Sequence, residues 1–326
     1  MASDFDDDGD VPLEARPRPR DYDFDVDRAL TSVVALGATV SDDAFTASTL
    51  GTERAGHGVV ISDDGVVLTI GYLVTEAEEV QLRTHQGAVV PGHVLGIDQA
   101  SGFALVQALE PLGVPALTLG DSRHAGLSDS CIVAGAGGRR RSLAARIVAR
   151  QEFAGYWEYL IEEAIFTMPG HPNWGGAALI GADGKLLGIG SLQLQHQGPS
   201  GPPRALNMVV PVELLLPIYD DLKAGRLSRP PRPWLGLFAQ EHQGGVVVLD
   251  VTQDGPAKRA GLRRGDTIRH SAGMEITNLA DFYRSVWALG AAGIDVPLTM
   301  ERDGDVFDLV LKSADRRSFL RAPRLH

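Results

Sequence analysis

The sequence predicts a mainly β protein that ends in a smaller α+β unit. Residues 56–195 contain short apolar runs separated by turn signals at intervals of about ten residues, a pattern typical of barrels and sandwiches. The following segment RLSRPPRP is rich in proline and predicts a stiff, extended linker. Behind it, residues 233–315 alternate strand-like and helix-like runs, which indicates a separate second unit.

Within the first unit, the clearest hairpin is GADGKLLGIG, in which two apolar runs flank Asp183 and Gly184. Residues 28–40 begin with an apolar run that Ala, Leu and Val leave open as helix or strand. Residues 211–225 read PVELLLPIYDDLKAG and predict a helix that stops at its final glycine. In the second unit we expect two strands, a short helix at PAKRAG, a strand, a helix at NLADFYRSVWALG, and two strands.

Composition and charge exclude several classes of function. The chain has 326 residues and a formal net charge of −12, so it has no general attraction for nucleic acid or for anionic membranes. Its single cysteine, Cys131, excludes an intrachain disulfide and a cysteine-rich metal site, and its apolar surroundings predict an inert, buried thiol. No cofactor is predicted. The start of the chain is acidic and the first apolar run, residues 29–40, is too short to span a bilayer, which predicts a cytoplasmic location without membrane contact.

Several segments in a common order resemble the HtrA/DegP family. In the first unit they are GHGVVISDDGVVLTIGYLV, VLGIDQASGFALVQ, LTLGDS, PNWGGAALIGADGKLLGIG and NMVVPVELL. In the second unit they are WLGL, DGPAKRAGLRRGDTI and ITNLADFYRSV. The resemblance implies a trypsin-like double six-stranded β-barrel followed by a PDZ domain, a small α+β sandwich. It also implies boundaries, namely an acidic segment without fixed structure at 1–27, a protease-like domain at 28–222, a linker at 223–232, a PDZ domain at 233–315 and a tail at 316–326.

The residues that match the family's catalytic triad do not carry its chemistry. That chemistry uses a serine nucleophile, a histidine base and an aspartate that orients the histidine. Here Tyr72 stands at the histidine position, Gly102 at the aspartate position and Trp174 at the serine position. Pro172, which has no N–H, stands at one position of the oxyanion hole. These residues predict a pseudoprotease, which is a catalytically dead HtrA-like chain that is not an enzyme and serves as a non-catalytic scaffold or regulator.

Alternatives to a dead cleft remain open. One is a serine-type endopeptidase of the same family with an unconventional active site, and another is a non-proteolytic enzyme with a metal held by His57 and His171. We expect both histidines to be solvated loop residues and no metal to be bound, because two histidines without a carboxylate partner are a weak metal signal. Ser191 matches a strand that lines the specificity pocket. The Trp174 indole either plugs the cleft or anchors a partner.

The second unit keeps the features of a peptide-binding PDZ domain. Such domains add an extended peptide to a sheet edge and hold its carboxylate on backbone N–H groups. By resemblance, this carboxylate-binding turn is Trp234, Leu235, Gly236 and Leu237. The alternative for Trp234 is packing against the barrel domain. The resemblance predicts protein C-termini or extended peptides as partners.

Helical spacing in the second unit adds further candidates for the peptide groove. Tyr283 and Val286 are expected to meet the ligand, while Phe282 and Leu289 pack inward. Family members trimerise through aromatic residues before the first barrel strand, so Tyr22 and Phe24 predict a homotrimer. The alternative is a tail whose aromatic residues have no such role.

Overall fold

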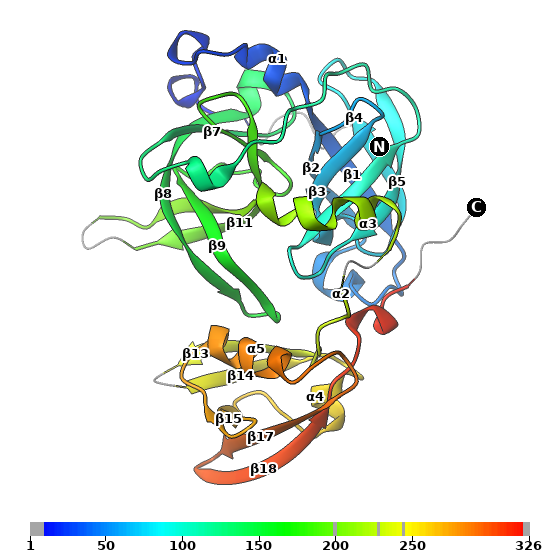
Figure 1. Cartoon of the computed structure of the whole chain (residues 1–326), viewed down its shortest axis with the longest axis vertical. Helices are drawn as coiled ribbons and strands as arrows, with labels where there is room; N and C mark the ends of the chain where they lie inside the picture. The colour runs from blue at the N-terminus through cyan, green and yellow to red at the C-terminus, as the bar shows by residue number, and fades with distance from the viewer. Residues whose placement is uncertain (1–9, 198–200, 227–228, 243–244, 322–326) are drawn as a thin grey trace. The chain divides into compact units, whose positions relative to one another are not determined.

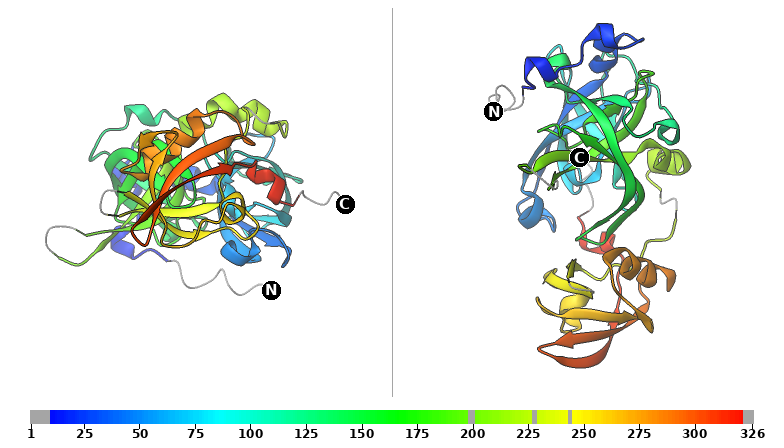
Figure 2. Two further views of the ribbon diagram at one scale, coloured as in Figure 1. Left: turned by 90° about the horizontal axis from the view of Figure 1, so that it is seen from below. Right: turned by 90° about the vertical axis from the view of Figure 1, so that its left-hand side faces the viewer.

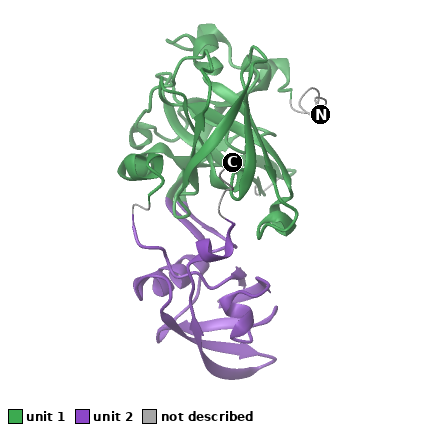
Figure 3. Ribbon diagram, turned by 90° about the vertical axis from the view of Figure 1, so that its right-hand side faces the viewer, with its two compact units in different colours: residues 1–151, 163–228, 322–326 green, residues 152–162, 229–321 purple. Residues whose placement is uncertain are grey.

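The computed structural model describes residues 10–197, 201–226, 229–242 and 245–321. The chain forms two compact units (Figure 3). The first unit contains most of the chain up to residue 228. The second joins Glu152–Glu162 to Arg229–Arg321, so it is built from two separate stretches of sequence.

Six antiparallel strands of the first unit close into a barrel in the order β1-β2-β3-β6-β5-β4 (Figure 1). Its interior is filled by β-branched and aliphatic side chains, and every residue of β3 is buried. The strands are β1 Val33–Val40, β2 Glu53–Val60, β3 Val66–Ile70, β4 Ala77–Arg83, β5 Val89–Ile97 and β6 Phe103–Ala108. The short helices α1, Val26–Thr31, and α2, Ala47–Leu50, precede and follow β1.

Six further strands close into a second barrel, which is drawn in shades of green in Figure 2. Their order around the barrel is β10-β11-β12-β9-β8-β7. They are β7 Ser130–Ala134, β8 Ser142–Gly155, β9 Tyr159–Met168, β10 Ala178–Ile180, β11 Leu186–His196 and β12 Arg204–Pro211. Cys131 and Ile165 are fully buried in the core of this barrel. The predicted double six-stranded barrel is therefore confirmed.

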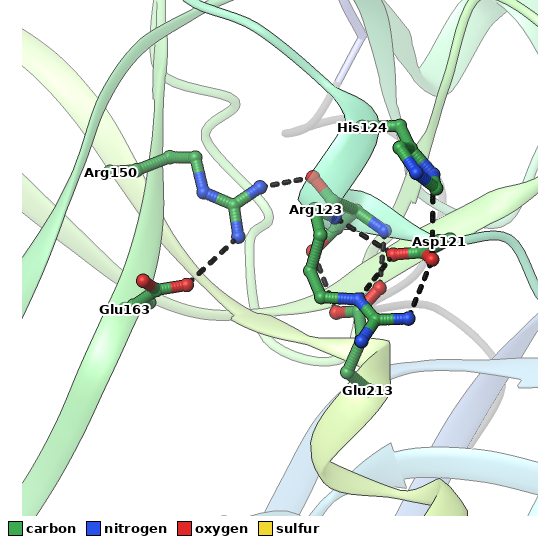
Figure 4. Close-up of polar contacts among 7 residues, drawn as sticks. Asp121, Arg123, His124, Arg150, Glu163 and Glu213 are labelled. Carbon is green, nitrogen blue, oxygen red and sulfur yellow. Dashed lines mark hydrogen bonds and ion pairs between the residues drawn. The ribbon is translucent and has the colours of Figure 1, made fainter.

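A polar network fastens the segment before β7 to the second barrel (Figure 4). The Glu213 carboxylate accepts hydrogen bonds from the backbone N–H and the hydroxyl of Ser122, the latter at 2.6 Å. Arg150 of β8 donates to the Ser122 carbonyl oxygen and lies 3.4 Å from the carboxylate of Glu163 on β9. The network thus ties β8 and β9 to the chain that follows β12.

The helix expected over 211–225 is broken into short pieces. The structure has 3₁₀ turns at Val212–Leu214 and Leu216–Ile218, followed by the helix α3 at Tyr219–Lys223. Pro217 explains the break, because proline has no N–H to continue the helical ladder. Gly225 follows α3 with φ +67°, the left-handed conformation that ends many helices.

The described part of the N-terminal segment, residues 10–27, is folded, which differs from the expectation of no fixed structure. It forms 3₁₀ turns at Leu13–Ala15 and Pro19–Asp21. Val11 is 1 % exposed and its N–H donates to the carbonyl oxygen of Arg140 at 2.8 Å. The Asp10 carboxylate lies 3.1 Å from the Arg140 guanidinium. An acidic segment is ordered here because it meets arginines and buries an apolar side chain.

The C-terminal part forms an antiparallel sheet in the order β13-β14-β15-β17-β18, with β16 paired to β15. Its strands are β13 Leu237–His242, β14 Gly245–Val251, β15 Thr267–Ser271, β16 Met274–Glu275, β17 Asp295–Arg302 and β18 Asp305–Lys312. Its helices are α4 Pro256–Arg259 and α5 Leu279–Ala288, and a 3₁₀ turn at Arg316–Phe319 follows β18. This is the predicted order of strands and helices with the two-residue strand β16 added, and β13 is left at one edge of the sheet. Within the described residues, no helix has both the length and the apolar character needed to cross a membrane.

Candidate functional site

The structure brings two of the predicted triad positions together. Tyr72 lies in a 3₁₀ turn at Gly71–Leu73, directly after β3, and its hydroxyl donates to the carbonyl oxygen of Ser191 at 3.0 Å. Burial raises the pKa of Tyr72, although a hydrogen bond with the Trp174 side chain lowers it. The phenol therefore stays protonated at neutral pH and acts as a hydrogen-bond donor.

The third triad position lies beside the same turn but offers only backbone. The Gly102 carbonyl oxygen accepts a hydrogen bond from the N–H of Gly71 at 2.6 Å. Gly102 has φ +81°, a conformation that glycine adopts without a steric cost. It joins β6 to the Tyr72 turn, and its missing side chain leaves no carboxylate at this position.

The loop that carries Trp174 is held by close backbone contacts. The Gly175 carbonyl oxygen accepts from the N–H of His57 at 2.8 Å, and the Gly176 N–H donates to the carbonyl oxygen of Gly190 at 2.9 Å. Gly176 has φ +78° and a Cβ there would lie 1.8 Å from the His57 carbonyl oxygen. Trp174 itself is half-buried. Its burial is intermediate between that of a side chain that plugs the cleft and that of an exposed anchor for a partner.

Pro172 lies on the surface of this loop. Its side chain is exposed. The neighbouring N–H of Asn173 donates to Nδ1 of His171 at 3.0 Å. The assignment of Pro172 to an oxyanion position stays a prediction, and so do the triad assignments of Tyr72, Gly102 and Trp174.

The expectation that His57 and His171 are solvated is wrong, because both are buried. His57 is 7 % exposed within β2 and its Nδ1 accepts from the N–H of Ala136 at 3.2 Å. His171 is fully buried, and its Nε2 lies 3.0 Å from the carbonyl oxygen of Arg141. Burial lowers the pKa of both imidazoles, that of His57 to about 3, so both are neutral at pH 7. No group of three or more potential metal-binding side chains occurs in the part of the chain that the structure describes.

The carboxylate of Glu158 lies on the turn that begins the C-terminal sheet. One of its oxygens accepts hydrogen bonds from the N–H groups of Gly236 and Leu237, at 2.7 and 3.1 Å. The other accepts from the N–H of Leu235 at 2.9 Å. Burial raises the pKa of Glu158 to about 7, against the three backbone hydrogen bonds, which lower it. Three successive backbone N–H groups thus converge on one anion, which is a carboxylate-binding geometry.

The other residues predicted for the peptide groove divide into two sets. The Tyr283 hydroxyl contacts the same residue as the carboxylate-binding turn, because it accepts a hydrogen bond from the N–H of Glu158 at 3.1 Å. Val286 and Phe282 are buried in the core of the C-terminal unit. Leu289, expected to pack inward, is 39 % exposed, because α5 ends at the preceding residue.

Trp234 packs within the C-terminal unit itself. Its ring lies 4.9 Å from that of Phe319 and its backbone pairs with Ala314. Its role in peptide binding stays a prediction. Sequence reasoning missed Glu158 altogether. Its segment lies 77 residues before the turn that it meets at Leu235, and no motif marks it.

Two parts of the chain match known protein families. Residues 56–189 match the family of trypsin-like peptidase domains, and residues 233–312 match the PDZ family. The chain has a trypsin-like domain followed by a PDZ domain. The carboxylate-binding turn at Leu235–Leu237 therefore belongs to the PDZ domain, at the start of its first strand.

Curated relatives match about three quarters of this chain. The chain is 29 % identical over 266 residues to a probable periplasmic serine endoprotease DegP-like of Pseudomonas fulva, covering 77 % of this chain and 54 % of the relative. It is 29 % identical over 268 residues to the protein of the same name from Ectopseudomonas mendocina, with the same coverage. The chain thus spans about half the length of the curated relatives that it matches.

Solved structures support the fold. The HtrA-type protease AlgW with a decapeptide is similar with a TM-score of 0.54 and 22 % identity, covering 92 % of this chain and 98 % of that one. The serine endoprotease from Yersinia pestis is similar with a TM-score of 0.51 and 21 % identity, covering 94 % and 99 %. At these identities the likeness concerns the arrangement of the chain only.

Two predictions from the sequence are corrected by these relatives. The chain was expected not to be an enzyme, but its relatives are named serine endoproteases, which contradicts that expectation and points to a protease. The cytoplasmic location was expected from the acidic start of the chain, but the same relatives are named periplasmic. Both expectations were negative conclusions, one drawn from the residues at the predicted triad positions and the other from the acidic start of the chain.

Proposed function

We propose that this chain is an HtrA-type protein whose PDZ domain binds the carboxyl-terminal ends of protein chains. The observation that carries the proposal is the convergence of the Leu235, Gly236 and Leu237 N–H groups on one carboxylate. A free chain end offers the same group, and an extended peptide behind it can add to the edge strand β13. The ligand class is therefore an extended peptide with a free α-carboxylate.

Peptide binding with and without the terminal charge tests this proposal. A fluorescein-labelled peptide that ends Tyr-Trp-Leu with a free carboxylate should bind, whereas the same peptide as a C-terminal amide should bind at least tenfold more weakly. The Gly236→Val chain should lose this preference, since Gly236 has φ +74° and a Cβ there would lie 3.1 Å from the Trp234 ring. Gly273→Val is the matched control, because Gly273 has φ +80° with no atom within 4 Å of a Cβ. Equal binding of acid and amide would contradict the proposal.

A second function, endoproteolysis by the peptidase domain, is favoured by the names of the relatives. The family's motif does not identify the nucleophile in this chain, because Tyr72, Gly102 and Trp174 stand at the positions predicted for its triad. We therefore propose an endopeptidase whose active site is unconventional. Incubation with unfolded casein should give cleavage, and a fluorophosphonate probe followed by peptide mapping should identify an activated serine. Casein that stays intact, with and without the PDZ ligand peptide, would refute this second function.

A homotrimer built through Tyr22 and Phe24 is a further proposal. Both rings are half-buried and lie edge to face at 5.5 Å. Phe24 packs on Gly184, where a Cβ would lie 2.6 Å from the ring. Sedimentation velocity should show a trimer that becomes a monomer in the Tyr22→Ser, Phe24→Ser chain. A monomer before substitution would refute it.

A further inference from the structure

We propose that the tip of the β8–β9 hairpin, residues 152–162, is an internal ligand of the PDZ groove that an incoming chain end must displace. The proposal rests on the proposed peptide-binding function and concerns its regulation. The tip and the PDZ domain belong to one compact unit. Four kinds of contact in that unit support the proposal.

The first contact is the carboxylate of Glu158. It accepts hydrogen bonds from the N–H groups of Leu235, Gly236 and Leu237, which are the donors that would bind the α-carboxylate of a chain end. A side-chain carboxylate presents the same two oxygens as an α-carboxylate, so these donors cannot hold both at once. Glu158 has φ +61°, which is uncommon outside glycine and aims the residue into this turn.

The second contact is made by the backbone of the tip, which hydrogen-bonds to the edge strand β13. The carbonyl oxygen of Tyr156 accepts from the N–H of Ala239 on the edge strand β13, at 2.9 Å. Tyr156 and Glu158 lie in the turn between β8 and β9, so this one turn supplies both a carbonyl oxygen to β13 and a carboxylate to the residues that begin it. On the opposite side, the Tyr283 hydroxyl of α5 donates to the carbonyl oxygen of Gly155 at 2.7 Å. The tip is therefore held by both the strand and the helix that form the groove.

The third contact is apolar. Leu160 is 6 % exposed and belongs to the same buried cluster as Leu235, Leu237 and Val286. The Tyr156 ring lies 6.0 Å from the Phe238 ring of β13. The tip thus supplies an aliphatic side chain and an aromatic ring together with its carboxylate, which is the combination that an apolar chain end would supply.

The fourth contact is a pair of ion pairs at the base of the tip. Arg284 of α5 meets the carboxylates of Glu152 and Glu162, the latter at 2.5 Å. These two residues mark the ends of the tip, so one guanidinium fastens both of its strands. All three side chains are partly exposed, so this contact contributes less than the buried carboxylate contact.

Hydrogen exchange and peptide binding on the full chain test the proposal. In the unaltered chain the N–H groups of residues 235–237 should be protected, and in Glu158→Gln and Glu158→Ala they should exchange at least tenfold faster. The Glu163→Ala chain is the control, because Glu163 lies on the same hairpin but its carboxylate meets Arg150. Protection that is unchanged in both Glu158 variants would overturn the proposal.

Binding of the free-acid peptide ending Tyr-Trp-Leu then separates this proposal from the proposed function. Both Glu158 variants should bind it at least tenfold more tightly than the unaltered chain, because the groove no longer has an internal competitor. Equal affinity in all chains would overturn the internal-ligand proposal and leave the peptide-binding function intact. Faster exchange in the variants without any peptide binding would support the docked tip but refute the proposed binding of chain ends.

Discussion

The Gly176→Ala substitution is expected to unfold the loop that carries Trp174. Gly176 has φ +78°, and a Cβ would lie 1.8 Å from the His57 carbonyl oxygen and 2.9 Å from Thr69 Oγ1. Real side chains do not approach backbone oxygen so closely, so the loop would have to move by more than an ångström. That shift would break the hydrogen bonds from His57 to Gly175 and from Gly176 to Gly190, at 2.8 and 2.9 Å.

The expected loss is the sum of three effects. The left-handed backbone costs alanine about 1 kcal/mol relative to glycine. Each broken hydrogen bond costs about 1 kcal/mol, and overpacking a buried contact costs about 1–3 kcal/mol. The peptidase domain should therefore lose about 4–6 kcal/mol of unfolding free energy, and its melting temperature should fall on the order of 10 °C.

Thermal unfolding followed by circular dichroism measures this loss against a matched control. Gly87→Ala places the same residue at φ +88°, where no atom lies within 4 Å of a Cβ. The control should lose only the backbone term of about 1 kcal/mol. If both substitutions lower the melting temperature equally, the close approach of Gly176 to His57 does not determine the stability of the loop.

Three further predictions concern single groups. Tyr72→Phe removes the 3.0 Å hydrogen bond to the Ser191 carbonyl oxygen and should cost about 1 kcal/mol in urea unfolding; no loss would contradict that bond. Burial raises the pKa of Asp266, but hydrogen bonds from Arg302 outweigh it and hold the pKa below its usual value. The ionised Asp266 carboxylate stabilises the fold fully above about pH 4, and this contribution is lost as the pH falls through the lower pKa of the folded state. Asp266→Asn should therefore make the unfolding free energy depend less on pH in the acid range. An unchanged pH dependence would count against a stabilising Asp266–Arg302 ion pair. Burial raises the pKa of Cys131 to about 12, so the native chain at pH 8 should react with a disulfide reagent only as fast as it unfolds, and rapid labelling would show an accessible thiol.

Local patterns in the sequence predicted most of the architecture. Alternating apolar runs and Asp-Gly turns predicted the strands of both barrels, because these patterns depend only on residues a few positions apart. The continuous helix predicted over 211–225 was wrong, because Pro217 lacks the N–H that a helix interior needs. The N-terminal segment was expected to lack fixed structure because its composition is acidic, and composition alone does not indicate that Val11 is buried.

Contacts between distant segments could not be predicted. The burial of His57 and His171 depends on how the loop that carries Trp174 packs on β2, and the neighbours of these histidines in the sequence do not indicate it. The docking of Glu158 depends on three N–H groups that lie 77 to 79 residues further along the chain. Propensity and periodicity report on neighbours, whereas these contacts arise only when the whole chain has folded.

The division of the second unit between two stretches of sequence affects how its parts can be studied. Leu160 belongs to the buried cluster of this unit, yet it lies about sixty residues before the linker in the sequence. A fragment that begins at the linker would therefore lack one of its core side chains and keep a binding groove with no resident carboxylate. Affinities measured on such an excised piece would describe a more open receptor than the one that the intact polypeptide presents.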